Sequence, residues 1–366
     1  MKHSRPQSLP SAQRPAPSAQ CLTRQSVAAV CLLCSIFSGV VARTPVPKFT
    51  VDRLFRDHVE CFWVDSAGRN IYVSSRERIY HSLDAGRSWK KLGSLPSVTL
   101  VKQIIPISPN RIFVNTSRGF GGTAYLSVDS GKRFCECLPF TGRGACASFE
   151  HSRHILFVVS EIPFQLMESK DSGVSWSAVG PQIDTLKNPV ICSLLVTKSP
   201  AGTKFFVSTS IPAAIYTCRN LYGQWRKCFS DPLYPDARMP SNREAPLVTE
   251  WGNDLIACMY GGAGSPMQRL YFSDNGGLSW RGKECPCEIW GVGVNNADTR
   301  TIWVGNFGSW PKSKPYDALQ FSPNRGRTWQ PVTNCEAQFF WQLQELPDRS
   351  LYAATDFGLI RVKLKE

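Results

Sequence analysis

Acidic residues and histidines are scarce in this 366-residue sequence, and the signatures of several enzyme classes are missing. There are 28 Asp and Glu against 42 Lys and Arg, a net charge of +14, and 5 histidines. The sequence has no H-E-x-x-H zinc helix, no G-x-S-x-G elbow and no phosphate-cradling Walker loop, which excludes serine hydrolases of that type and Walker-type nucleotide binding. The basic excess either is a solvated surface or favours an anionic partner such as an acidic glycan, a lipid headgroup or nucleic acid, although no specific nucleic-acid motif is present.

The first 42 residues form a leader. They include four Lys and Arg and no acidic residue, and residues 26–42 are a short apolar core that is marginal for spanning a bilayer. The stretch Val40-Val41-Ala42 supplies the small residue that signal peptidase requires. We predict a signal peptide over 1–42 and one secreted or extracytoplasmic domain over 43–366 with a net charge of +10; a membrane anchor at residues 26–42 is the alternative.

Eleven of the 14 cysteines follow the leader, as expected in an oxidising compartment. Cys218 and Cys228 flank one proposed hairpin, so a disulfide between its two strands is one option, and the connectivity is left open. Two further local groups are Cys135, Cys137 and Cys146, and Cys285, Cys287 and Cys335. Disulfides or buried thiols are favoured over zinc for the C-x-C pairs, because zinc sites usually use C-x-x-C or histidine partners. We predict no metal site and no cofactor.

One short motif recurs along the chain. It reads Ser/Thr-x-Asp/Asn-x-Gly-x-Ser/Thr-Trp, and its copies are Ser82–Trp89, Ser127–Phe134, Ser169–Trp176, Ser273–Trp280 and Ser322–Trp329, with a worn copy over Thr217–Trp225. The closing aromatic residues are separated by 45, 42, 49, 55 and 49 residues. Four short strands and their connections need about 40 to 50 residues, so this period predicts an all-β propeller.

Each residue type in the motif has a structural role in a tight hairpin. The Asp or Asn accepts backbone N–H groups, the Gly permits a positive φ, and the aromatic residue holds the turn against a hydrophobic layer. Because the same residues recur at every turn, Asp84, Asp129 and Asp171 are predicted to be structural rather than catalytic.

These motifs resemble the Asp boxes, or bacterial neuraminidase repeats, of the sialidase-like propeller superfamily. The resemblance covers nearly all of the chain after the leader. It implies that each box joins the third and fourth strands of a blade, at the rim away from a ligand-binding funnel. It does not imply one substrate, since Asp boxes occur in glycosidases, lyases, assembly factors and receptors.

The strand pattern predicts seven blades, with six blades and an appendage as the alternative. In the first blade the strands are expected at 61–65, 70–75, 79–82 and 88–92. After the last motif, residues 339–346, 350–355 and 359–364 supply three strands, and residues 48–53 are predicted to complete that blade and close the ring.

Two sets of loops are expected to face the funnel, namely the entries to the inner strands and the turns between second and third strands. Arginine forks bind carboxylates, aromatic rings stack on sugars, and paired carboxyl groups serve as acid and base in glycoside cleavage. The predicted ligand-binding residues are Arg76, Arg78, Arg118, Arg243 and Trp310. The candidate catalytic residues are Glu161, Glu244, Glu288, Asp356 and Tyr316.

The roles differ among these candidates. Glu161 or Glu244 would be the proton donor and Asp356 or Glu288 its counterpart. A lyase would need a Tyr or His base near an arginine, and Tyr316, Tyr260 and His58 are available for that role. Sialidases also carry an Arg-Ile-Pro motif, which is absent here, so classical sialidase activity is not expected. We predict an extracytoplasmic propeller that acts on or binds glycans, possibly as a glycoside hydrolase. The alternatives are a non-catalytic scaffold for a protein or anionic polysaccharide, and a polysaccharide lyase.

Overall fold

The computed structural model describes residues 48–365 except for several short segments. The segments outside the description are 96–99, 118–122, 139–145, 151–154, 162–163, 183–190, 200–201, 211–212, 222, 231–246, 252–253, 260–268, 286–288, 290 and 307–317. The predicted leader therefore lies outside the described residues. Among the residues described, no helix is long and apolar enough to cross a membrane.

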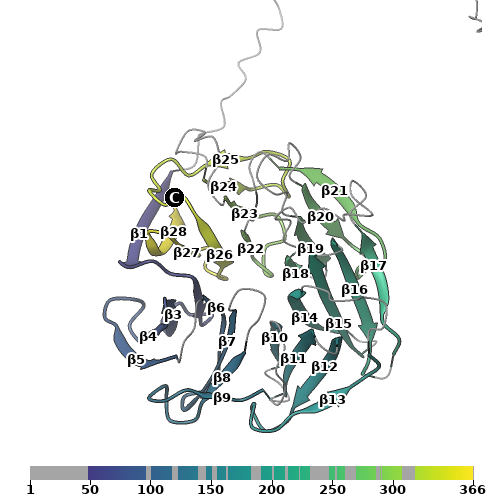
Figure 1. Cartoon of the computed structure of the whole chain (residues 1–366). Helices are drawn as coiled ribbons and strands as arrows, with labels where there is room; N and C mark the ends of the chain where they lie inside the picture. The colour runs from purple at the N-terminus through teal and green to yellow at the C-terminus, as the bar shows by residue number, and fades with distance from the viewer. Residues whose placement is uncertain are drawn as a thin grey trace, which may run out of the picture. The chain divides into compact units, whose positions relative to one another are not determined.

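The described strands form seven antiparallel sheets of four strands each, arranged in a ring (Figure 1). The first three sheets along the chain are β2 (Cys61–Val64), β3 (Ile71–Ser75), β4 (Arg78–Ser82) and β5 (Lys90–Ser94); β6 (Leu100–Ser108), β7 (Arg111–Ser117), β8 (Ala124–Ser127) and β9 (Cys135–Glu136); and β10 (Cys146–Glu150), β11 (Ile155–Glu161), β12 (Phe164–Ser169) and β13 (Ser177–Val179). The next two are β14 (Ile191–Ser199), β15 (Gly202–Ser210), β16 (Ala213–Arg219) and β17 (Arg226–Ser230); and β18 (Leu247–Trp251), β19 (Asp254–Met259), β20 (Arg269–Ser273) and β21 (Arg281–Glu284). The last two are β22 (Gly291–Val294), β23 (Ile302–Gly305), β24 (Leu319–Ser322) and β25 (Gln330–Pro331); and β26 (Phe340–Glu345), β27 (Leu351–Thr355) and β28 (Gly358–Leu364) with β1 (Phe49–Phe55).

The second strand of each sheet forms the core, because it lies between two strands of its own sheet and between two neighbouring sheets. All five residues of β3 and of β27 are buried. The fourth strands are at the rim, where Lys90–Ser94 and Cys135–Glu136 are largely exposed. The first strands contact one another around the ring, which closes between β26 and β2. The predicted β-propeller is confirmed.

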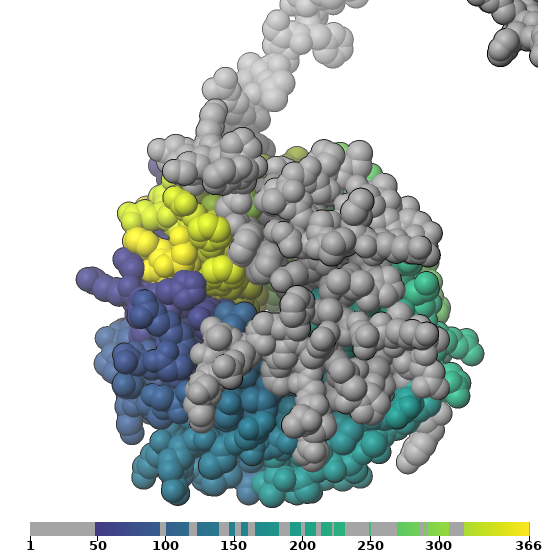
Figure 2. All heavy atoms as spheres, in the orientation of Figure 1, coloured from purple at the N-terminus to yellow at the C-terminus, as the bar shows by residue number. Residues whose placement is uncertain are grey.

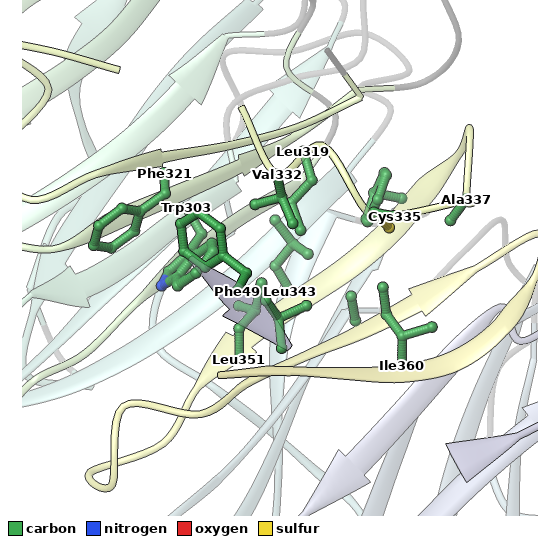
Figure 3. Close-up of a cluster of buried hydrophobic side chains, with 13 residues drawn as sticks. Phe49, Trp303, Leu319, Phe321, Val332, Cys335, Ala337, Leu343, Leu351 and Ile360 are labelled. Atoms are coloured by element: carbon green, nitrogen blue, oxygen red, sulfur yellow. The ribbon is translucent and has the colours of Figure 1, made fainter. Parts of the chain in front are cut away.

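Ring closure joins the two ends of the described chain. Strand β1 pairs antiparallel with β28, from Phe49 opposite Leu364 to Phe55 opposite Leu359. Figure 2 shows the purple N-terminal strand against the yellow C-terminal strands. The Phe49 ring packs edge-on against Trp303, at 5.7 Å between centroids, within the buried cluster of Figure 3. The predicted closing strand is therefore present, and it pairs over 49–55.

The repeated turns share one hydrogen-bond pattern. In the first copy, the Ser82 hydroxyl donates to Asp84 Oδ1 at 2.8 Å and accepts the Gly86 N–H at 2.9 Å. Asp84 Oδ1 also accepts the Ser88 N–H at 2.9 Å. The same contacts recur in the other four complete copies, with Asn275 and Asn324 in place of aspartate. The aspartate and asparagine side chains of the motif therefore serve to form the turns.

The structure does not form the bridge considered for Cys218 and Cys228, since both are free thiols. Their strands do pair, but Thr217 lies opposite Arg226 and a bulge near Cys228 shifts the register. The Cys228 thiol donates to the Ile215 carbonyl at 3.4 Å, whereas the Cys218 thiol donates to the Gly223 carbonyl at 2.9 Å. The two sulfurs therefore belong to different positions along the hairpin.

Candidate functional site

One face of the ring gathers the turns between second and third strands together with the entries to the first strands. The second strands end there in small polar residues that are fully buried, including Ser74, Ser75, Thr116, Thr209 and Thr355. Their hydroxyls fix the loops. The Ser74 hydroxyl, for example, accepts the Cys61 N–H at 3.1 Å and donates to the Cys61 carbonyl at 3.2 Å.

The chain crosses this face where it passes from β1 to β2, over residues 56–60. The Val59 N–H donates to the Thr355 carbonyl at 3.0 Å, which ties the crossing to the end of β27. Asp57 accepts the His58 N–H at 2.9 Å and the Ser75 hydroxyl at 3.1 Å, which ties it to the end of β3. The crossing thus holds the last sheet and the first sheet together at this face.

Three aromatic rings lie side by side at the crossing, and we call His58, Phe339 and Trp341 the aromatic ledge. Phe339 and Trp341 stand on either side of the buried Phe340 at the start of β26, where the register shows a bulge at Trp341. Their rings stack with centroids 6.1 Å apart and planes 11° apart. His58 meets Trp341 edge-on at 5.6 Å. All three residues are half-buried, so part of each ring is exposed.

Exposed cationic groups lie on the same face of the ring as the ledge. The Arg53 guanidinium lies 3.6 Å from the centroid of the Phe357 ring, in the turn between β27 and β28. Arg76 and Arg78, both predicted ligand-binding residues, are exposed in the turn between β3 and β4. Arg78 pairs with Glu77 at 3.5 Å, where the two side chains are 50% and 44% exposed, so this pair leaves both groups accessible.

Glu60 is the buried carboxyl group of this region. Its side chain is 8% exposed, lies 4.0 Å from His58 Nε2, and accepts the Val101 N–H at 3.3 Å. Burial raises the pKa of Glu60, and the charge of Glu77 adds to this, whereas the Val101 hydrogen bond and Arg76 oppose it. The contact to Val101 gives Glu60 a role in holding the neighbouring sheet.

Of the five candidate catalytic residues, Asp356 is the one whose side chain the structure describes. It is exposed in the turn between β27 and β28, and its Oδ1 accepts the N–H groups of Gln338 and Phe339, both at 3.1 Å. These bonds position the start of β26 and hence the ledge. Asp356 therefore orients the aromatic residues through the backbone.

The other predicted site residues are not placed. Arg118, Arg243, Glu244, Glu288, Trp310 and Tyr316 lie outside the described residues, and for Glu161, at the end of β11, the backbone alone is described. The structure brings Arg76 and Arg78 to the face that carries Asp356. Within the described part of the chain, no group of three or more His, Cys, Asp or Glu side chains is arranged to hold a metal ion.

Sequence reasoning did not select Phe339 and Trp341. The sequence analysis places the run Phe339-Phe340-Trp341 in a strand. Side chains alternate in burial along this run, because Phe340 is fully buried and its two neighbours are half-buried. That alternation is the signal by which the two partly exposed rings could have been found. The contact of His58 with Trp341 joins residues far apart in sequence, which no local pattern records.

Comparison with known proteins supports the fold. No protein-family model and no curated protein matches this sequence. Among solved structures, a GH74 enzyme from Niastella koreensis aligns with a TM-score of 0.62 and 14% identity over 85% of this chain, which spans 53% of that enzyme. YCF48 bound to D1 peptide aligns with a TM-score of 0.59 and 13% identity over 88% of this chain and 100% of that one. Streptogramin B lyase aligns with a TM-score of 0.62 and 14% identity, covering 87% and 98%. At this identity the likeness concerns the propeller fold.

Proposed function

We propose that this chain is an extracytoplasmic propeller that binds glycans on the face carrying the aromatic ledge. The observation that carries the proposal is the half-buried set of His58, Phe339 and Trp341, on a face that also carries exposed guanidinium groups. Partly exposed rings offer apolar faces to sugar rings, and arginines offer paired donors to carboxylates or hydroxyls.

Binding without cleavage is favoured by the way the described carboxylates are used. Asp356 and Asp57 each accept two hydrogen bonds from the protein, and Glu60 is buried against the next sheet. A retaining or inverting glycosidase needs two carboxyl groups free to reach one glycosidic bond. A hydrolase built on Glu161, Glu244, Glu288 or Tyr316 would contradict this part of the proposal.

Two further assignments belong to the same proposal. We infer that the repeated turns are Asp boxes of the sialidase-like superfamily, because their Ser, Asp or Asn, and Gly residues make the same bonds in every complete copy. We also infer export through the basic and apolar leader over residues 1–42.

A glycan-array screen of residues 43–366 tests the proposal. We expect saturable binding to a defined set of glycans. Phe339→Ala and Arg76→Asn should each weaken that binding by about tenfold or more, since each removes a ring face or a charged donor. Asn suits the positive φ of 55° at Arg76, so this variant should fold normally.

The matched control is Trp63→Ala, which removes a half-buried tryptophan of β2 that packs edge-on against Tyr72 at 6.0 Å. It should leave glycan affinity unchanged. Equal losses in the control and ledge variants would contradict a site at the ledge. If the array is silent and an extended peptide binds instead, the glycan proposal is wrong and the ledge is a peptide site.

A further inference from the structure

The repeated turns over residues 273–280 and 322–329 differ from the first three in what the neighbouring sheet places against them. Each complete turn has a glycine that a side chain from the preceding sheet contacts. The pairs are Leu54 with Gly86, Leu92 with Gly131, Leu126 with Gly173, Lys204 with Gly276, and Lys283 with Gly326. Lysines therefore stand at the last two of these junctions, where leucines cover the first three.

Lys283 is held with its charge at the rim. Its Cδ lies 3.7 Å from the position that a Cβ on Gly326 would take, so the stem packs on the turn as the leucines do. Its ammonium group donates to the Arg325 carbonyl at 3.1 Å. Burial lowers the pKa of Lys283, and the nearby positive charge of Arg327 adds to this effect.

Arg325 stands at a position that favours small residues. Its φ is 60°, and the equivalent positions in the other complete turns hold Ala85, Ser130, Ser172 and Gly276, all with φ between 61° and 65°. A long side chain in the left-handed region is disfavoured relative to glycine. An arginine at this position adds a second cation beside Lys283.

The closing tryptophan of this turn makes no bond to the preceding sheet through its indole N–H, among the residues that the structure describes. The indole N–H of Trp89 donates to the Leu54 carbonyl of the preceding sheet at 2.9 Å, and Trp176 donates to the Cys137 carbonyl at 2.9 Å. The buried indole N–H groups of Trp280 and Trp329 have no acceptor within the described part of the chain. The turn over 322–329 thus lacks a bond that two of the other four complete turns make.

A hollow of about 590 Å³ lies at this junction. Its walls include four cationic side chains, one carboxylate and one aromatic ring, namely Arg281, Lys283, Arg325, Arg327, Asp274 and Phe272. Asp274 is paired with Arg281. The hollow therefore has a net positive charge, and its volume lies in the range of ligand sites, about 300–1,000 Å³.

We propose that this rim groove, between β21 and the turn over 322–329, is a second binding site that takes the acidic groups of a polysaccharide. Ammonium and guanidinium groups bind carboxylates and sulfates, and the Phe272 ring provides an apolar wall for a sugar face. A concave site of this size suits a few sugar units better than a flat lipid surface or the long charged face that a nucleic-acid duplex needs. This site is independent of the ledge.

The experiment measures the affinity of residues 43–366 for heparin oligosaccharides and for polygalacturonate oligomers. The test variant is Lys283→Leu with Arg325→Ala, which installs residue types that the first turn and its neighbouring strand already carry. We expect affinity for at least one of the two acidic probes to fall by about tenfold or more. The melting temperature should stay close to that of the parent, because alanine already occupies the equivalent position at Ala85 and, like arginine, carries a Cβ at a positive φ.

The matched control is Arg87→Ala with Lys90→Ala, which removes two exposed cations at the turn covered by Leu54. Its affinity for the same probe should stay within about twofold of the parent. Equal losses in both double variants would show non-specific attraction and overturn the proposal. So would tighter binding of a DNA duplex or of phosphatidylserine vesicles than of either acidic oligosaccharide, or unchanged binding in the test variant.

Discussion

At the scale of single residues, Glu345 shows how burial changes an acid that takes no part in the ligand face. It is 6% exposed near the end of β26, and its carboxylate accepts the Thr301 hydroxyl at 3.0 Å. Burial raises its pKa from 4.5 to about 7, and the charge of Asp298 adds to the shift, although Asp298 is itself paired with Arg300 and Arg349. The folded state therefore prefers the protonated acid. The stabilisation that comes with protonation is complete below the ordinary pKa and is lost as the pH rises through about 7.

Glu345→Gln should therefore stabilise the protein at alkaline pH, by about 2–3 kcal/mol above pH 8, and should have little effect near pH 5. Thermal unfolding at both pH values measures the difference. Glu284→Gln is the control, because the Glu284 side chain is 77% exposed. If Glu345→Gln lowers the melting temperature equally at both pH values, the prediction is contradicted. The effect on stability would then come from the hydrogen bond of Thr301 and not from the buried charge of Glu345.

At the scale of elements, the repeated turn is the unit whose structure is best predicted from the sequence. The bonds that its serine, aspartate and glycine make are local, within four residues, so residue type and spacing determine them. Strand positions were predicted for the same reason, since the alternation of apolar and polar residues is local. Cys218 and Cys228 do not lie opposite each other, because Thr217 already pairs with Arg226, the first residue of β17, and Cys218 lies beyond that pair. The ledge was not predicted, because it requires β26 and the β1-to-β2 crossing to meet, and no local pattern records that contact.

The turn has a testable weak point in its buried serine. Ser82→Ala should lower the free energy of unfolding by about 1–3 kcal/mol, because it leaves the Gly86 N–H without its acceptor. Ser88→Ala, at the exposed end of the same turn, should have a smaller effect. Urea denaturation of the two variants gives the comparison, and equal losses would contradict the assigned role of the buried serine.

At the scale of the whole molecule, the ring depends on β1. The backbone passes so close to Gly358 that a Cβ there would lie 1.9 Å from the Phe55 carbonyl oxygen, and the φ of 129° is disfavoured for other residues. Gly358→Ala should push β1 off β28 and expose a sheet edge. We expect a fall of several degrees in melting temperature and faster proteolysis near residue 55.

Gly276→Ala is the matched control for the glycine change. Its φ is 65°, the neighbouring atom is the end of the flexible Lys204 side chain, and alanine occupies the equivalent position at Ala85. Its melting temperature should stay close to that of the parent. Similar losses in both variants would mean that the strained backbone, and not ring closure by β1, explains the effect at Gly358.

The central claim is that the ledge face binds a glycan without cleaving it. The most direct measurement is to incubate residues 43–366 with an oligosaccharide selected on the array and to follow bound ligand and reducing ends in the same sample. The account predicts saturable binding that Phe339→Ala weakens, with the oligosaccharide recovered intact. Release of new reducing ends that stops in Asp356→Asn, Glu161→Gln, Glu244→Gln or Glu288→Gln would contradict it and would identify a glycosidase.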